Sequence, residues 1–251
     1  MYTEFSDRTR TFVFTDKTES TNNDVKKAVY ASSSPVFTVL AADSQYGGRG
    51  RLGRQFFSPD GGLYFSISFP LTGRESNIPF LTLLVGLAVS EAIEEITGLE
   101  TSVKWPNDIY LNGKKLGGIL CELVCGKYMC AVAGIGINLG IRKEDIPAEL
   151  SGIMTSFAAE GVSVPDKKQL IKKIVNKTDE YIYEKHQLNE VSDENYEKIR
   201  LRSFSIGKKV RYILEDTVCE GVVTDIKKNG AAEILFADGT KKEIFCGEIV
   251  Q

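Results

Sequence analysis

The sequence contains few of the residues that usually build metal centres or histidine-based catalytic sites. Among 251 residues there are one histidine, one tryptophan and three methionines. His186 is remote in sequence from every glycine-rich turn, so neither a zinc site nor a Ser-His-Asp mechanism is favoured. The five cysteines, an odd number without Cys-x-x-Cys spacing, do not suit a disulfide framework. We therefore expect no metal site and a reducing compartment such as the cytoplasm.

An excess of positive charge and a long uninterrupted apolar run are also missing. Lys and Arg number 31 against 34 Asp and Glu, a net charge of −3, which leaves no global positive field for nucleic acid. The longest apolar region, 78–96, contains Pro79 and three glutamates, which indicates a core helix rather than a membrane span. The first residues lack the basic start and apolar stretch of a secretory signal. The sequence thus predicts a cytoplasmic protein with neither DNA nor membrane as a partner.

Composition and length indicate an ordinary globular protein with one larger domain and one small domain. Hydrophobic residues make up 42% and charged residues 26%, enough to bury a sizeable core. Apolar runs and capping residues predict strands at 12–14, 36–42 and 63–69, and helices at about 21–31 and 78–96. The runs at 102–111, 115–124 and 128–138 predict a three-stranded meander, with Asn112-Gly113 as a hairpin turn.

The last third of the sequence changes from helical to alternating patterns. Apolar spacing predicts one long amphipathic helix at 166–188 and a shorter helix at 193–204. Four short alternating runs then predict a small β-barrel, at 210–214, 218–227, 231–236 and 241–245. We place the domain boundary between a larger domain of residues 1–204 and a barrel domain of residues 205–251.

The most informative stretch is the arginine loop, which we define as residues 45–56. Its first ten residues hold four glycines and three arginines, Arg49, Arg51 and Arg54. Glycines let backbone amides approach a ligand, and guanidinium groups match phosphate or carboxylate oxygens, so the stretch predicts an anionic ligand. The formal Gly48-x-Gly50-x-x-Gly53 match to the dinucleotide fingerprint is weak, because the next element is a predicted strand. A flexible surface loop is the alternative for this segment taken alone.

A second cluster lies in the predicted meander. In Lys104-Trp105-Pro106-Asn107-Asp108 a lysine sits in an otherwise apolar strand, which is costly unless its ammonium meets an anion or the strand face is exposed. Gly117-Gly118 and Gly134-x-Gly136-x-Asn138 place positions without side chains on adjacent strands. A flat ligand could lie against the sheet there, and close helix packing would explain the glycines equally well.

Taken together, these motifs resemble those of the biotin protein ligases. The resemblance is carried in order by Glu19-Ser20-Thr21-Asn22, Gln45 with the arginine loop, the Lys104 motif, Lys115-Leu116-Gly117-Gly118-Ile119-Leu120 and Gly134-Ile135-Gly136-Ile137-Asn138. It implies an α/β (α+β) catalytic domain on a mixed sheet, shared with lipoate ligases, and a C-terminal SH3-like barrel. Bifunctional members carry an N-terminal DNA-binding winged helix, whereas the catalytic motifs here begin so early that we expect the monofunctional form.

The resemblance also implies a role for each matching residue. Ser20, Thr21 and Gln45 would bind the ureido ring of biotin, with Asn22 adjacent and Gly117 and Gly118 beside the substrate. Arg49, Gly50 and Arg51 would close over biotin and phosphate, and Lys104 would lie between the biotin carboxylate and the α-phosphate. Arg54, Phe56 and Asn138 would contact the nucleotide. Leu52 stands where the family often has arginine, and Gln55-Phe56 replaces the Lys-Trp of the best-known bifunctional member.

The implied reaction is a two-step ligation that needs no protein nucleophile. Biotin and ATP, with Mg²⁺, give biotinyl-5′-AMP and pyrophosphate, and a lysine of a biotin carboxyl carrier protein then displaces AMP. Positioning and charge neutralisation suit this chemistry, which agrees with arginine and lysine in the motifs. Two alternatives stay open: a lipoate or octanoate ligase or transferase, and a non-catalytic biotin-binding regulator. A homodimer through an exposed edge of the meander is a further expectation that the sequence leaves open.

Overall fold

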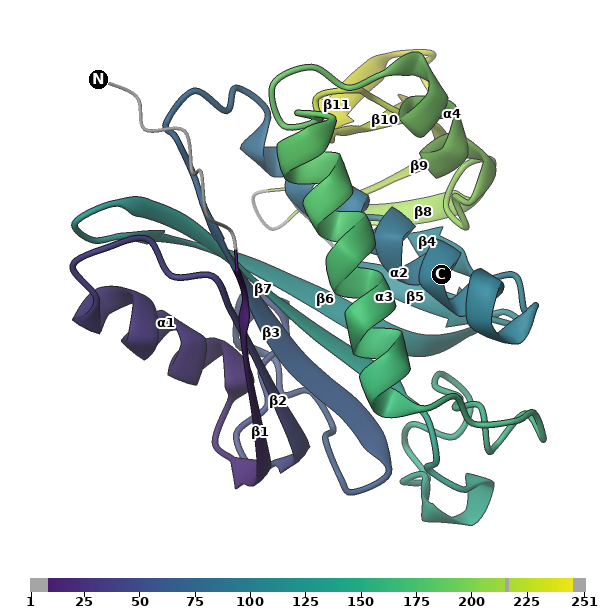
Figure 1. Ribbon diagram of the computed structural model, residues 1–251. Helices are drawn as coiled ribbons and strands as arrows, with labels where there is room; N and C mark the ends of the chain where they lie inside the picture. Colours follow the sequence, from purple (N-terminus) through teal and green to yellow (C-terminus); the bar gives the residue numbers. More distant parts are fainter. Residues whose placement is uncertain (1–8, 215–216, 246–251) are drawn as a thin grey trace.

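A seven-stranded mixed sheet forms the main layer of the computed structural model, which describes residues 9–214 and 217–245 (Figure 1). The strand order is β1-β2-β3-β7-β6-β5-β4; β1 and β2 run parallel, and the other neighbours are antiparallel. The strands are β1 (Thr11–Thr18), β2 (Thr38–Gln45), β3 (Gly62–Pro70), β4 (Ser102–Lys104), β5 (Asp108–Leu111), β6 (Lys114–Cys125) and β7 (Met129–Asn138). The mixed sheet confirms the predicted α/β fold class.

Helices cover both faces of this sheet. Helix α1 (Thr21–Ala31) packs on β2, β3 and β7, whereas α2 (Leu81–Thr97) packs on β4, β5 and β6 from the other side, next to α3 (Lys167–Asp179) (Figure 1). Helix α4 (Asp193–Leu201) follows and contacts α2. Short helical turns complete the chain: η1 (Arg51–Gly53), η2 (Ile78–Phe80), η3 (Lys143–Asp145) and the π-helical η4 (Glu180–Glu184). Because α1 is short, part of its sheet face is left without a helix.

The alternation of side chains along β7 determines what lies on that open part. Cys130 and Val132 pack into the apolar cluster under α1, while Ala131 and Ala133, which alternate with them, belong to the main core under α2. A strand alternates faces with period two, so the next positions on the α1 face are Gly134 and Gly136. Beyond the end of the α1 cluster, β7 therefore contributes no side chains of its own to this face of the sheet.

Two predicted elements differ from the structure. The single strand expected at 102–111 is the antiparallel pair β4 and β5, with Lys104 opposite Asp108 and the Asn107 amide donating to the Lys104 carbonyl at 3.1 Å. Pro106 has no N–H to continue a ladder, which is why the chain reverses there and the meander has four strands. The long helix expected at 166–188 is also wrong: α3 ends at Asp179 and continues only as the π-helical turn η4.

The C-terminal region is a separate four-stranded antiparallel sheet. Its order is β11-β10-β9-β8, from the strands β8 (Lys209–Leu214), β9 (Thr217–Ile226), β10 (Ala232–Phe236) and β11 (Lys241–Ile244). The Trp105 indole Nε1 donates to the Gly230 carbonyl at 3.0 Å, and the Trp105 amide donates to Ser205 Oγ at 3.0 Å. The small sheet thus contacts the Lys104 motif directly, while its closure into a barrel and the boundary at residue 205 stay predictions. In the ranges that the structure describes, no helix is long and apolar enough to cross a membrane.

Candidate active site

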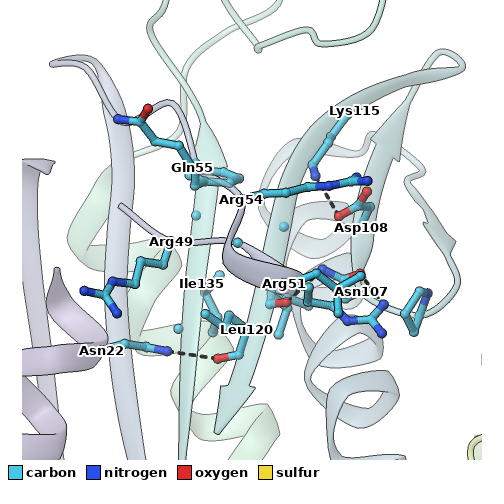
Figure 2. A pocket seen from close by; sticks show the side chains of 18 of the residues that line it. Asn22, Arg49, Arg51, Arg54, Gln55, Asn107, Asp108, Lys115, Leu120 and Ile135 are labelled. Atoms are coloured by element: carbon cyan, nitrogen blue, oxygen red, sulfur yellow. Dashed lines mark hydrogen bonds and ion pairs between the residues drawn. The ribbon is translucent and has the colours of Figure 1, made fainter. Parts of the chain in front are cut away.

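A cavity of about 360 Å³ opens on the glycine-bearing face of the sheet (Figure 2). The start of α1, the arginine loop, the β4–β5 turn and the central strands β6 and β7 all contribute to its wall. All but two of the predicted site residues line it, namely Ser20, Thr21, Asn22, Gln45, Arg49, Gly50, Arg51, Arg54, Phe56, Lys104 and Gly118. Segments that are far apart in the sequence therefore meet at one site.

One end of the cavity is lined mainly by neutral hydrogen-bonding groups, and the Arg49 guanidinium at its edge lies 3.8 Å from the Glu19 carboxylate. The Thr21 amide donates to Gln45 Oε1 at 2.9 Å, and Gln45 Nε2 donates to Ser58 Oγ at 3.1 Å, which fixes the orientation of the Gln45 amide group. Ser20 is the N-cap residue of α1, yet its hydroxyl caps no backbone amide of that helix. This buried hydroxyl faces the cavity with hydrogen-bonding capacity for a polar ligand group.

The arginine loop forms one rim of the cavity and is held by its own backbone. The Phe56 amide donates to the Gly48 carbonyl at 2.9 Å, and the Gly50 amide donates to the Arg54 carbonyl at 2.7 Å. A side chain at Gly48 would place a Cβ 2.5 Å from Ser58 Oγ, so this close approach requires glycine. Arg51 Nη1 lies 3.4 Å from Asn107 Oδ1, which links the loop to the β4–β5 turn (Figure 2).

The other end of the cavity gathers positive charge from two lysines. Lys104 Nζ donates to the Tyr110 hydroxyl at 3.4 Å. Burial, followed by the nearby Asp108 carboxylate, raises the pKa of Tyr110 to about 12, so this phenol stays protonated at neutral pH. Lys115 Nζ pairs with Asp108 Oδ1 at 2.8 Å, and Figure 2 shows this pair beside the Arg54 side chain. The cationic end is therefore built from the strands and the arginine loop together.

Lys115 is a cavity residue that the sequence analysis did not select. In an uninterrupted strand Lys115 and Gly118, three residues apart, would point to opposite faces. The pairing of β5 with β6 shifts after Ile109, and the buried Leu116 is the extra residue of a β-bulge. Lys115 and Gly118 consequently both line the cavity. The sequence signal that could have identified it is its position just before the Gly117-Gly118 pair.

An aromatic side chain lies over the glycine floor of the cavity. Gly118 and Gly136 are paired across β6 and β7, and a Cβ at Gly136 would approach the Phe56 ring to 2.5 Å. The Lys115 ammonium lies 5.8 Å from the centre of the same ring. Glycine at these positions is thus explained by the close approach of an aromatic group, as a flat ligand site on the sheet would require.

Gly117 and Asn138 lie outside the cavity lining. A Cβ at Gly117 would stand 2.3 Å from the Gly136 carbonyl oxygen, so close strand pairing requires glycine here, and its contact with substrate stays a prediction. Asn138 lies on β7 beyond the glycine floor, where its Nδ2 donates to the Thr155 carbonyl at 2.9 Å. Its Oδ1 is buried and, among the described residues, has no hydrogen-bond donor. An unsatisfied buried acceptor is uncommon and agrees with a missing donor at this end of the site.

Carboxylate and histidine clusters suited to a resident metal do not occur in the described part of the chain. Asp108 is the one carboxylate among the residues that line the cavity. Mg²⁺ usually takes one or two carboxylates and completes its coordination with water and substrate phosphates. The site therefore fits a metal ion that arrives with a nucleotide.

Comparison with known proteins places the chain in a family. It belongs to the biotin/lipoate A/B protein ligase family, whose model matches residues 14–138. A biotin protein ligase from Aquifex aeolicus, solved in complex with biotin and ATP, is 34% identical to it, with a TM-score of 0.80 over 95% of this chain and 97% of that chain. The resemblance predicted from the motifs is thereby confirmed.

Two curated relatives extend the comparison. A biotin–acetyl-CoA-carboxylase ligase from Mycobacterium tuberculosis is 29% identical over 245 residues, which cover 93% of this chain and 86% of the relative. A bifunctional ligase/repressor from Bacillus subtilis is 37% identical over 147 residues, which cover 57% of this chain and 45% of the relative. The match thus spans less than half the length of the Bacillus subtilis relative.

Proposed function

We propose that this protein is an ATP-dependent biotin protein ligase that forms biotinyl-5′-AMP and then biotinylates a carrier lysine. The observation that carries the proposal is a single cavity with a neutral, hydrogen-bonding end and a cationic end. Biotin has the same polarity, with a neutral ureido ring at one end and a carboxylate at the other. Ser20, Thr21 and Gln45 would bind the ring, with Asn22 adjacent, and Lys104 and Lys115 would receive the carboxylate and the α-phosphate.

In the first step a carboxylate oxygen of biotin attacks the α-phosphorus of ATP. The bond from that phosphorus to the bridging oxygen breaks, and pyrophosphate leaves. Both reactants are anions, so cations fixed near them lower the barrier by neutralising charge that would otherwise repel. Arg49, Arg51 and Arg54 on the loop and the two strand lysines would supply these cations.

The nucleotide would bind beside Phe56, whose ring covers the glycine floor. A purine ring stacks on an aromatic side chain, and the buried Oδ1 of Asn138 offers an acceptor for an exocyclic amino group such as that of adenine. Mg²⁺ bound to the phosphates would offset their charge. Lys115 pairs with Asp108 and would help to hold that carboxylate in place.

In the second step the unprotonated amine of an acceptor lysine attacks the carbonyl carbon of the mixed anhydride. An amide bond forms, AMP leaves, and the amine loses a proton to solvent. The lysine of a biotin carboxyl carrier protein, the acceptor domain of a biotin-dependent carboxylase, is the proposed acceptor. The names of the related ligases support this choice of partner.

The lipoate branch of the same family is the competing proposal. A dithiolane ring has no N–H or C=O group, so it would not use the hydrogen-bonding capacity that Ser20, Thr21 and Gln45 offer beyond their bonds within the protein, at a cost in binding. These groups therefore favour biotin.

Mass spectrometry after incubation with ATP, Mg²⁺ and either biotin, lipoate or octanoate tests the proposal. We expect biotinyl-adenylate in the first mixture and label transfer to a carrier domain but not to its Lys→Arg variant. Adenylation of lipoate or octanoate alone would replace the biotin proposal with the lipoate branch. Binding of biotin without any adenylate, in a folded protein with Mg²⁺ and ATP present, would indicate a non-catalytic regulator.

A further inference from the structure

An ion pair outside the cavity connects directly to its neutral end. Lys26 Nζ on α1 lies 2.7 Å from Glu122 Oε1 on β6, and the side chains are 23% and 34% exposed. Glu122 Oε2 accepts a hydrogen bond from Asn22 Nδ2 at 2.9 Å. Asn22 lines the cavity, whereas neither Glu122 nor Lys26 does. The pair is therefore one hydrogen bond away from the ligand site.

From Asn22 a buried chain of hydrogen bonds continues along the floor of the neutral end. Ser66 Oγ lies 2.6 Å from Asn22 Oδ1 and 2.8 Å from Thr21 Oγ1. Thr21 Oγ1 in turn lies 3.2 Å from Gln45 Oε1. Asn22, Ser66 and Thr21 are all buried. In this series of hydrogen bonds, whether a group donates or accepts therefore depends on what its neighbour does.

The carboxylate at position 122 determines this direction. An ionised carboxylate only accepts, so Asn22 must turn its NH₂ group toward Glu122 and its carbonyl oxygen toward Ser66. Ser66 then donates its one hydrogen to Asn22. The Leu120 carbonyl, 3.2 Å from Asn22 Nδ2, favours the same orientation. A Cβ at Gly134 would lie 2.2 Å from Asn22 Oδ1, so glycine there leaves the space that the amide group fills.

The direction matters at Thr21, which faces the ligand. With Ser66 donating to Asn22, the Thr21 hydroxyl hydrogen goes to Ser66 or Gln45, and the Thr21 oxygen is left to accept from a ligand N–H. A flipped Asn22 would donate to Ser66 and place the Ser66 hydrogen on the Thr21 oxygen, in competition with the ligand. We propose that Glu122, held by Lys26, is a positioning residue that sets Thr21 as an acceptor for a ureido N–H of biotin.

This inference rests on the proposed function, and its test begins by showing that the wild-type protein forms biotinyl-adenylate. Glu122→Leu removes the acceptor at similar volume, and we expect the KM for biotin to rise about tenfold, as for loss of a hydrogen bond to a charged group. The KM for ATP and kcat should stay within about twofold. Glu122→Gln keeps one acceptor oxygen, so it should return the KM for biotin to within about threefold of wild type.

Asp43→Leu is the matched control, because Asp43 on β2 forms a comparable ion pair with Lys167, at 2.7 Å, outside this chain of hydrogen bonds. It should leave the KM for biotin unchanged, and thermal unfolding should show that all variants fold. If Glu122→Leu does not fold, Glu122→Ser, whose side chain is too short to reach Asn22, takes its place with the same expectation. An unchanged KM for biotin in an active Glu122→Leu enzyme would overturn the inference. Equal increases in both KM values, or no recovery in Glu122→Gln, would overturn it as well, whereas an inactive wild type would instead refute the proposed function.

Discussion

Replacing Lys115 with glutamine should slow adenylate formation about a hundredfold, because it removes a cation and also leaves Asp108 without its partner. Lys115 Nζ and Asp108 Oδ1 are 2.8 Å apart, and their side chains are 28% and 22% exposed. Unit charges about 4 Å apart interact by about 4 kcal/mol at an effective dielectric of about 20, and partial exposure reduces this. We take about 3 kcal/mol for the charge imbalance in the transition state, which corresponds to about a hundredfold in rate.

Pyrophosphate release at saturating biotin and ATP measures this step, with circular dichroism to confirm folding. The informative comparison is Lys115→Gln with Asp108→Asn in one protein. If the unpaired carboxylate repels the phosphates, its neutralisation should recover about tenfold of the lost rate. A folded Lys115→Gln enzyme with the wild-type rate would refute the role of the lysine. A double variant no faster than the single one would refute the part assigned to the unpaired acid.

Three further substitutions probe other parts of the cavity. Lys104→Gln should reduce the adenylation rate by on the order of 10²-fold with the fold retained, and a wild-type rate of pyrophosphate release would reduce Lys104 to a structural residue. Arg51→Ala should release biotinyl-adenylate about tenfold faster, since it loses the contact to Asn107 and the cation over the phosphate. If the complexes of the variant and the wild type decayed equally fast after dilution, the loop would have no role in holding the adenylate. Gly136→Ala should raise the KM for ATP about tenfold, because its Cβ would stand 2.5 Å from the Phe56 ring. Gly152→Ala, which has open space around the new Cβ, should leave this KM unchanged. Equal KM values in the two variants would show that the glycine floor has no part in nucleotide binding.

Local pattern was sufficient for most elements and for most of the residues that line the cavity. Alternating runs located the four strands of the C-terminal sheet to within a residue or two, because Asn229-Gly230 and Asp238-Gly239 are unambiguous turn signals. The glycine-rich arginine loop and the start of α1 were also readable, since close backbone approach and helix starts need particular residue types, although the Ser20 hydroxyl makes no capping hydrogen bond. These features depend on neighbours in sequence, so the sequence by itself determined them.

The tertiary structure decided which faces and which partners these residues share. Lys115 enters the cavity only because the bulge at Leu116 reverses the alternation of β6, and a bulge depends on pairing with another strand. Lys104 lies at a chain reversal because β4 and β5 pair with each other, and the close approach of β7 requires glycine at position 117. Asn22 and Glu122 are far apart in sequence, and their hydrogen bond exists because α1 packs across β6. Register, bulges and long-range polar pairs are set by packing between distant segments, which local patterns along one chain do not encode.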